Sequence, residues 1–317
     1  MKIENILVVG ANGFVGYYLV KRLVQCKYMV IGLDCNDDNI SEFLEKDNYM
    51  FIKMNLFEED FFDIKIKIDV IVNLAAIGHG TLLSKKNEVI FDPIYVNLKI
   101  TEKLFKYAIS YNVKHVIQMS SASVYGNSMR IQNEEMSLEL NSPYAISKAT
   151  MEFIGEIYSK LYQINVISYR AFNIYGYNKS AKRYNSNIIH NLIMYAMDEK
   201  SAIIYGSQQI KRDYIYVDDV IDGIIFAIER KLESGIYNLA KGETYSIDDV
   251  WEYICELVQP QNKKLLSLKR NYLNVPMYSH ADMLKMNKKG FYCKTTIKKG
   301  ILNIYKLLPD SVQLNYN

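Results

Sequence analysis

Cysteine and arginine are scarce in this sequence, and each shortage excludes a class of function. The four cysteines share no metal-ligand or redox spacing, so we expect no metal site and reduced thiols, as in cytoplasmic proteins. Only seven of the 38 basic residues are arginine, and the basic residues form no stripe along the chain. A nucleic-acid partner is therefore not expected.

Long hydrophobic runs are absent as well, although half of the residues are hydrophobic. No run approaches the roughly 18 apolar residues that a membrane span needs. A strand-like run, Ile6–Val9, begins almost at once and leaves no room for a signal peptide of roughly 15 to 30 residues. We expect a cytoplasmic protein without a membrane partner. The sequence also lacks internal repeats and linkers rich in proline and glycine.

In the first half, apolar strand-like runs alternate with helical segments, which is typical of a parallel sheet covered by helices on both faces. The expected strands are Ile3–Val9, Met29–Leu33, Met50–Met54, Val70–Asn73, Val113–Met119 and Val166–Ala171. The expected helices are about Gly13–Gln25, Val96–Tyr111 and Tyr144–Leu161. We predict an α/β fold with a Rossmann-like, doubly wound parallel sheet.

A glycine-rich turn joins the first strand to the first helix. Gly10 allows a tight turn, Gly13 lets the backbone approach a pyrophosphate, and Gly16 lets the helix pack closely on the strand. The helix N-terminus offers free N–H groups to phosphates. Asp34 ends the next strand, where its carboxylate would accept hydrogen bonds from ribose hydroxyls and repel a 2′-phosphate. These features favour NAD over NADP as the cofactor.

The second half is less regular. We expect a loop from Tyr175 to Asn185 and a polar, basic stretch from Gln259 to Pro276. The other expected elements are helices at Ser186–Met197, Val217–Glu229 and Ile247–Val258 and strands at Ala202–Tyr205 and Gly235–Leu239. We predict an NAD-binding domain over residues 1–175, to which segments near 213–240 return. A smaller, partly interleaved α/β substrate domain would cover residues 176–317.

Tyr144 and Lys148 lie four residues apart, which places them on one face of a helix. An ammonium beside a phenol favours the phenolate, so we expect the pKa of Tyr144 to fall from about 10 toward neutral pH. Such a tyrosine can take the proton of an alcohol while a hydride leaves the same carbon. Ser121 could polarise the alcohol without adding charge. A surface pair is the alternative reading in a chain with 27 tyrosines.

These motifs together resemble the extended short-chain dehydrogenase/reductase superfamily. The closer resemblance is to its NAD-dependent nucleotide-sugar epimerase and dehydratase branch, and within that to UDP-glucose 4-epimerases. It covers nearly the whole chain. The further stretches that carry it are Asn73–Ala76, Asn97, Arg170–Gly176, Arg212–Val220, Tyr237 with Asn238, and Ala281 with Asp282 and Lys285.

The resemblance implies roles for particular residues. Tyr144 would be the general base, Lys148 would hold the nicotinamide ribose, and Ser121 would bridge the sugar O4 and the tyrosine. The implied cofactor contacts are Gly10, Asn12, Gly13, Phe14, Val15, Gly16, Asp34, Asn55, Leu56, Leu74, Ala75, Ala76, Asn97, Tyr144 and Lys148. Asn55 stands where the family usually has an aspartate that meets the adenine amine, and Asn97 fits structural amide capping equally well.

The resemblance also implies substrate contacts. It puts Arg212 on a substrate diphosphate, since a planar guanidinium suits phosphate oxygens, with a salt bridge to Asp213 or Asp218 as the alternative. The other implied substrate contacts are Ser121, Ser123, Asn173, Asn187 and Tyr205. For Ser120 and Ser123, a role as a turn or strand-end hydroxyl is favoured over a catalytic one. The family's arginine-x-glycine-aspartate segment is absent, with Lys269–Tyr272 as the nearest replacement, and His79 lies in a second stretch that departs from the pattern.

The serine run, Ser120-Ser121-Ala122-Ser123, decides against one reaction of the branch. Sugar 4,6-dehydratases carry Asp-Glu where this chain has Ala122 and Ser123, and neither residue can act as an acid or a strong base. We predict a nucleotide-sugar epimerase with tightly bound NAD, acting at C4 of a UDP-hexose through a 4-keto intermediate in surface-polysaccharide assembly. The alternatives are an NAD(P)H-dependent 4-keto-6-deoxy-sugar reductase and a non-catalytic dinucleotide sensor. By analogy with the family we expect a homodimer.

Overall fold

A computed structural model of the chain describes residues 3–59, 64–78, 92–179, 187–230, 232–268 and 278–308. The chain divides into two compact units. Unit 1 comprises residues 1–126, 137–171 and 221–237, and unit 2 comprises residues 127–136, 172–220 and 238–317. No helix within the described ranges is long and apolar enough to cross a membrane.

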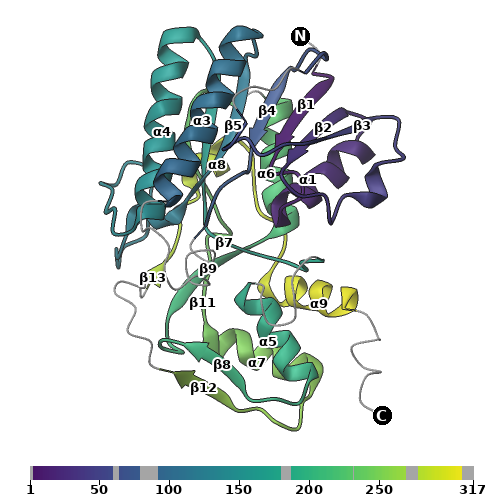
Figure 1. Cartoon of the computed structure of the whole chain (residues 1–317). Coiled ribbons are helices and arrows are strands. Elements are labelled where there is room, and N and C mark those ends of the chain that lie inside the picture. Colours follow the sequence, from purple (N-terminus) through teal and green to yellow (C-terminus); the bar gives the residue numbers. More distant parts are fainter. Residues whose placement is uncertain are drawn as a thin grey trace. The chain divides into compact units, whose positions relative to one another are not determined.

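A seven-stranded sheet with the order β10-β6-β5-β4-β1-β2-β3 forms the centre of unit 1 (Figure 1). Its strands are β1 (Asn5–Val9), β2 (Met29–Asp34), β3 (Tyr49–Lys53), β4 (Val70–Asn73), β5 (His115–Ser121), β6 (Asn165–Ala171) and β10 (Gly235–Leu239). The five neighbouring pairs from β6 to β3 are parallel. The strand order reverses at β1, and such a switch point is where sheets of this kind bind ligands. The predicted α/β fold class is confirmed.

Helices cover both faces of this sheet. Helix α1 (Phe14–Gln25) contacts α6 (Val217–Arg230) through the Arg22–Asp222 ion pair of 2.8 Å. Helices α3 (Asp92–Ser110) and α4 (Pro143–Tyr162) pack side by side (Figure 1). The core between the sheet and these two helices is made of branched aliphatic and aromatic side chains, including Leu7, Val9, Ile31, Ile71, Leu104, Phe105 and Val116.

Helix α4 packs against the sheet at a residue without a side chain, Gly155. A Cβ at Gly155 would lie 2.7 Å from the Gln118 side-chain nitrogen and 2.9 Å from Val166. The Gln118 amide uses this space to donate to the Met151 carbonyl of α4 and to the Ser168 hydroxyl of β6, both at 2.8 Å. The helix is therefore fixed to two strands by buried polar contacts.

Unit 2 is built from smaller sheets. Strand β9 (Lys211–Tyr216) lies between β11 (Thr244–Ser246) and β13 (Tyr278–Ser279), and it also pairs with β7 (Asn173–Tyr175). Strands β8 (Ala202–Tyr205) and β12 (Leu265–Leu268) form a separate parallel pair. The helices of unit 2 are α5 (Ile188–Met197), α7 (Ile247–Val258), α8 (Leu284–Lys288) and α9 (Ile297–Leu307). Two short 3-10 turns, η1 (Ser41–Phe43) and η2 (Ala122–Tyr125), belong to unit 1.

The differences from the sequence-based expectations lie mainly in unit 2. The stretch expected to be polar and basic contains β12, and the short strands β7, β9, β11 and β13 were not predicted. Strands this short give too little apolar alternation to recognise. The helix expected from Ser186 begins at Ile188, because the Asn187 side chain caps it by accepting a hydrogen bond from the His190 N–H at 3.0 Å. Residues 180–185 of the expected loop, and Ser186, lie outside the described residues.

Candidate functional site

The glycine-rich turn between β1 and α1 has a geometry that larger residues could not adopt. Gly10 has a φ of +81°, and a Cβ there would lie 2.8 Å from the Ala75 backbone nitrogen. A Cβ at Gly16 would collide with the Gly10 carbonyl oxygen, which accepts a hydrogen bond from the Gly13 N–H at 3.1 Å. Gly13 caps α1 without a side-chain hydrogen bond, and α1 continues through Phe14 and Val15. The turn thus presents bare backbone at a helix N-terminus, which suits a phosphate.

Asp34 is held rigidly at the end of β2. Its Oδ2 accepts from the Asn12 N–H at 2.9 Å and its Oδ1 from the Asn36 N–H at 3.2 Å. The buried Asn39 fixes the same turn from the other side: its N–H donates to Asn12 Oδ1 at 2.7 Å, and its side-chain nitrogen donates to the Asn12 carbonyl at 3.0 Å. The sequence analysis did not identify Asn39, since its partner lies 27 residues away.

A cavity of about 390 Å³ opens beside this turn. We call it the glycine-turn cavity, and its volume lies within the range of small-molecule sites. Of the residues that the resemblance implied, eight line it: Gly10, Gly13, Asp34, Asn55, Leu56, Leu74, Ala75 and Ala76. Its walls are mainly apolar, with an acidic group at one end. The bare turn and the fixed carboxylate fit the phosphate and ribose of a dinucleotide.

Two predicted cofactor asparagines have structural partners of their own. The Asn55 side-chain oxygen accepts from the Phe57 N–H at 3.1 Å. The Asn97 side-chain oxygen accepts from the Ile77 N–H at 2.8 Å, and its nitrogen donates to the Ser147 hydroxyl at 3.0 Å. The capping that we gave as an alternative for Asn97 is therefore present. Asn97 links the segment after β4 to the helix that carries Tyr144.

Ser121, Tyr144 and Lys148 meet where β5 ends and α4 begins. Ser142 caps α4 by accepting from the Ala145 N–H at 3.1 Å, which places Tyr144 in the first turn. The side chains of Ser121 and Tyr144 are hydrogen-bonded to each other. The Lys148 nitrogen lies 5.6 Å from the centre of the Tyr144 ring and donates to the Met119 carbonyl at 2.6 Å. Of the three, Lys148 is the most deeply buried, with 3% of its surface exposed.

The electrostatics of this constellation differ from the expectation. Burial raises the pKa of Tyr144 above 10, although its hydrogen bond with Ser121 pulls the pKa down. Burial lowers the pKa of Lys148 to about 8, against an opposing effect of Glu152. We predicted a lowered pKa for Tyr144 from the spacing of the two side chains. Spacing gives proximity but not burial, and desolvation penalises both charged forms.

Ser123 lies in η2, immediately after this group. Its N–H donates to the Ser121 hydroxyl at 3.1 Å. Its own hydroxyl is buried, and no partner for it exists among the described residues. A buried hydroxyl without a partner costs free energy unless a ligand or water satisfies it. Ala122 and Ser123 leave no carboxylate at the two positions where the dehydratases carry an acid and a base.

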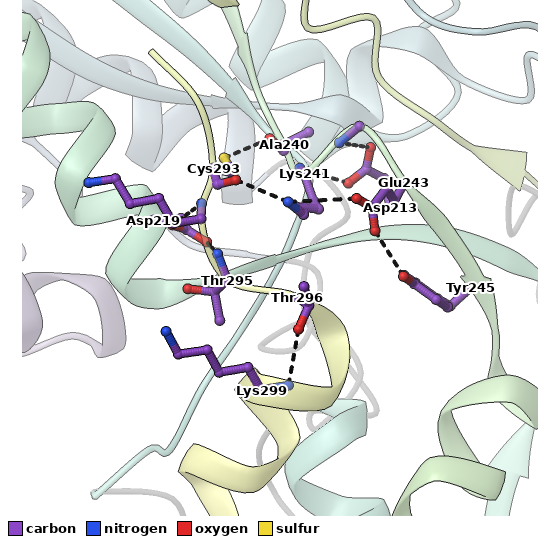
Figure 2. Close-up of polar contacts among 12 residues, drawn as sticks. Asp213, Asp219, Ala240, Lys241, Glu243, Tyr245, Cys293, Thr295, Thr296 and Lys299 are labelled. Carbon is purple, nitrogen blue, oxygen red and sulfur yellow. Dashed lines mark hydrogen bonds and ion pairs between the residues drawn. The ribbon is translucent and has the colours of Figure 1, made fainter.

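In unit 2, Asp213 is fully buried and organises the strand that carries Arg212. Its two carboxylate oxygens accept from the backbone N–H groups of Lys241 (2.9 Å), Gly242 (3.0 Å) and Ala281 (3.2 Å). Figure 2 shows Asp213 within a wider polar network of this unit. Burial raises the pKa of Asp213 to about 7, although the three N–H donors act in the opposite direction. The Asp213 carboxylate thus holds three backbone N–H groups of unit 2 in place around β9.

Arg212 itself is partly buried on β9. Burial lowers the pKa of this guanidinium, and nearby Tyr214 opposes the effect. Its one hydrogen bond among the described residues is a long contact of 3.4 Å to the Lys211 carbonyl. The salt bridge to Asp213 or Asp218 that we gave as an alternative does not form among the described residues. A partly desolvated guanidinium in this state is suited to a bound anion.

The remaining predicted substrate residues of unit 2 lie on separate elements. Asn173 on β7 donates to the Asp213 carbonyl at 2.9 Å. Asn187 caps α5, and its side-chain nitrogen donates to the Gly176 carbonyl at 2.9 Å. Tyr205 on β8 is 53% exposed. His79 and Lys269–Tyr272 lie outside the described residues.

The sequence model of the NAD dependent epimerase/dehydratase family matches residues 6–240. The chain belongs to this family. It is 30% identical over 326 residues to an uncharacterized protein of Methanocaldococcus jannaschii, and the match covers 95% of each chain. It is 28% identical to the uncharacterized UDP-glucose epimerase YtcB of Bacillus subtilis, over 94% of this chain and 96% of the relative.

Solved structures agree with this family assignment. The chain is similar to UDP-glucuronic acid 4-epimerase from Bacillus cereus in complex with NAD, with a TM-score of 0.82 and 25% identity. The similarity covers 99% of this chain and all of that one. The resemblance drawn from the sequence is confirmed. Because the family is NAD-dependent, NAD is confirmed as the cofactor as well.

Proposed function

We propose that the protein is an NAD-dependent nucleotide-sugar epimerase that inverts C4 of a UDP-hexose through a transient 4-keto sugar. The observation that carries the proposal is the Ser121–Tyr144–Lys148 constellation, in the same unit as the glycine-turn cavity and without a carboxylate at positions 122 and 123. The names of two similar proteins, a UDP-glucose epimerase and a UDP-glucuronic acid 4-epimerase, support the same reaction.

Each catalytic residue receives a role that its position allows. Tyr144 would accept the proton of the sugar C4 hydroxyl and return it after the new configuration has formed. Ser121, hydrogen-bonded to Tyr144, would hold the same sugar oxygen. Lys148, as an ammonium beside the ring, would favour the phenolate and hold the nicotinamide ribose. When bound, NAD supplies the group that accepts and returns a hydride.

We further propose that residues 1–175, with segments near 213–240, form the NAD-binding domain. Asp34 would bind the adenosine ribose, and Asn12, Phe14, Val15 and Gly16 would contribute the phosphate-binding turn. The lining residues of the glycine-turn cavity and Asn97 would complete the cofactor site. Residues 176–317 would bind the nucleotide sugar. In that range Arg212 would bind the diphosphate, and Asn187 and Tyr205 would hold the base. Two residues before that range would also contact the substrate: Asn173 would support the diphosphate, and Ser123 would donate to a sugar hydroxyl.

We also propose a homodimer in the cytoplasm that serves surface-polysaccharide synthesis. Side chains of α4 support the dimer, since Phe153, Ile157 and Leu161 are each more than half exposed. Apolar patches of this kind mark interaction surfaces. The four cysteines are free, which supports a reducing compartment.

The test is turnover without added cofactor. Purified protein that holds NAD is incubated with UDP-glucose, UDP-galactose, their N-acetyl forms and UDP-glucuronic acid, and products are separated by chromatography. We expect one pair to interconvert. Protein shown to hold NAD that interconverts no nucleotide sugar would contradict the proposal. The reductase alternative instead requires stoichiometric consumption of NAD(P)H with a 4-keto-6-deoxy sugar.

A further inference from the structure

A buried ion pair lies one helical turn beyond Lys148 and has no part in the proposed chemistry. Glu152 of α4 and Arg170 of β6 are 3% and 2% exposed. Arg170 Nε donates to Glu152 Oε1 at 2.9 Å, and a terminal nitrogen donates to Oε2 at 2.7 Å. Taking two charges out of water is costly, and a buried pair is often no more stabilising than packed apolar side chains. Its presence here is better explained by what it positions.

The pair belongs to a set of contacts that tie three consecutive residues of β5 to three different turns of α4. The Met119 carbonyl accepts from Lys148, the Ser120 hydroxyl donates to Glu152 Oε1, and Ser121 is hydrogen-bonded to Tyr144. Arg170 is the cross-strand partner of Ser120 in the β5–β6 register. Glu152 thereby ties α4 to two strands of the sheet. Ser120, a structural hydroxyl, is part of this tie.

The charge of Glu152 also acts on Lys148. It raises the pKa of the lysine against the larger effect of burial. The elements packed on this part of α4 bring Arg170 from β6, held 4.9 Å from the centre of the Tyr125 ring of η2. Strand β5 contributes the Met119 carbonyl, and α3 contributes the uncharged Asn97, bonded to Ser147. Glu152 is the carboxylate that favours the charged form of Lys148.

We propose that Glu152 is a positioning residue for the Ser121–Tyr144–Lys148 constellation. Anchored by Arg170 and Ser120, it sets the register of α4 on β5 and keeps Lys148 as an ammonium beside Tyr144. The inference rests on the proposed function, because it assigns Glu152 to the same reaction. It adds a residue that acts through others and does not itself contact the sugar.

Two substitutions separate the effect of the Glu152 charge from the effect of its side-chain length. Glu152→Gln keeps the shape and removes the charge, whereas Glu152→Asp keeps the charge and shortens the side chain. Glu156→Gln is the matched control, since Glu156 forms an exposed ion pair of 2.6 Å with Lys160 on the same helix. Circular dichroism checks that each variant folds. We expect kcat for nucleotide-sugar interconversion to fall about 10- to 100-fold in both Glu152 variants, with a smaller change in KM.

The titration of Lys148 is the measurement that would stay unchanged if Glu152 had a purely structural role. It can be followed by NMR of protein carrying ¹³C at the lysine ε-carbon, with Lys148→Met to assign the signal. We expect Lys148 to lose its proton at lower pH in Glu152→Gln than in the parent protein, and near the parent pH in Glu152→Asp and Glu156→Gln.

Particular results overturn this inference. An unchanged Lys148 titration in folded Glu152→Gln contradicts the charge effect. If Glu152→Gln does not fold, an unchanged kcat in Glu152→Asp contradicts the register effect. Failure of the parent protein to interconvert any nucleotide sugar would instead contradict the proposed function, while the NMR titration would still decide whether Glu152 controls Lys148.

Discussion

The two units hold their proposed binding residues in different ways. In unit 1, eight of the predicted cofactor residues line one cavity, and the turn beside them is fixed by the Asn12–Asp34–Asn39 contacts. In unit 2, Asn173 and Asn187 are engaged in structural hydrogen bonds, while Tyr205 is exposed and Arg212 makes one long contact. The cofactor residues of unit 1 are therefore preorganised by contacts within the chain. In unit 2, the Arg212 guanidinium is the group that remains available to a ligand.

The largest effect should come from the unit that is preorganised. Tyr144→Phe removes the hydroxyl that would carry the proton, so we expect kcat to fall about 10²- to 10⁴-fold, as is usual for loss of a general base. NAD content, measured on the denatured protein, should stay unchanged. Tyr158→Phe on the same helix is the control. A Tyr144→Phe enzyme with the parent kcat would exclude Tyr144 as the proton carrier.

The next largest effect should come from the Arg212 guanidinium in unit 2. Arg212→Ala removes a guanidinium that would form charge-assisted hydrogen bonds, so we expect KM for the nucleotide sugar to rise about 10- to 100-fold. UDP binding measured by calorimetry should weaken in parallel. The neighbouring exposed residue provides the control Lys211→Ala. Equal UDP affinities of Arg212→Ala and the parent would remove the diphosphate role.

A smaller effect tests the fit of the glycine-rich turn. Gly16→Ala places a methyl group against the Gly10 carbonyl, which the backbone must move to accommodate. We expect the free energy of unfolding to fall by about 1–3 kcal/mol, as for other overpacked sites, together with a lower NAD content. Gly78→Ala is the control, because a Cβ at Gly78 meets nothing within 4 Å. Similar denaturant midpoints for both variants would contradict this steric argument.

The smallest effect concerns Asn39. Asn39→Ala removes the side-chain donor of the Asn12 carbonyl, so we expect a loss of about 1 kcal/mol in the free energy of unfolding. NAD affinity should fall only a few-fold. Asn36→Ala should change neither, since the Asn36 contact to Asp34 is made by its backbone N–H. Should Asn36→Ala weaken NAD binding as much as Asn39→Ala, the turn would not depend on the Asn12–Asn39 contact.

Features whose partners lie close in sequence could be predicted. The strand–glycine turn–helix arrangement and the Tyr144–Lys148 spacing fall into this class, and the fold class followed from the alternation of apolar segments. The structural role of the buried Asp213 carboxylate could not be predicted. Its three donors lie 28, 29 and 68 residues away, and they are backbone groups without a sequence signature. The pKa of Tyr144 moved in the direction opposite to the expectation, since the number of atoms that surround a phenol is a property of the folded chain.

The close packing at Gly155 limits how helix α4 can be stabilised by substitution. Replacing a glycine in a helix interior by alanine usually raises the free energy of unfolding by about 0.5–1 kcal/mol, because alanine has the higher helix propensity. Here the methyl group would meet the Gln118 amide and Val166, and it would push α4 away from β5. A substitution that improves the helix as an isolated segment would displace the helix that holds Tyr144. Thermostability and turnover should therefore be optimised together at this position.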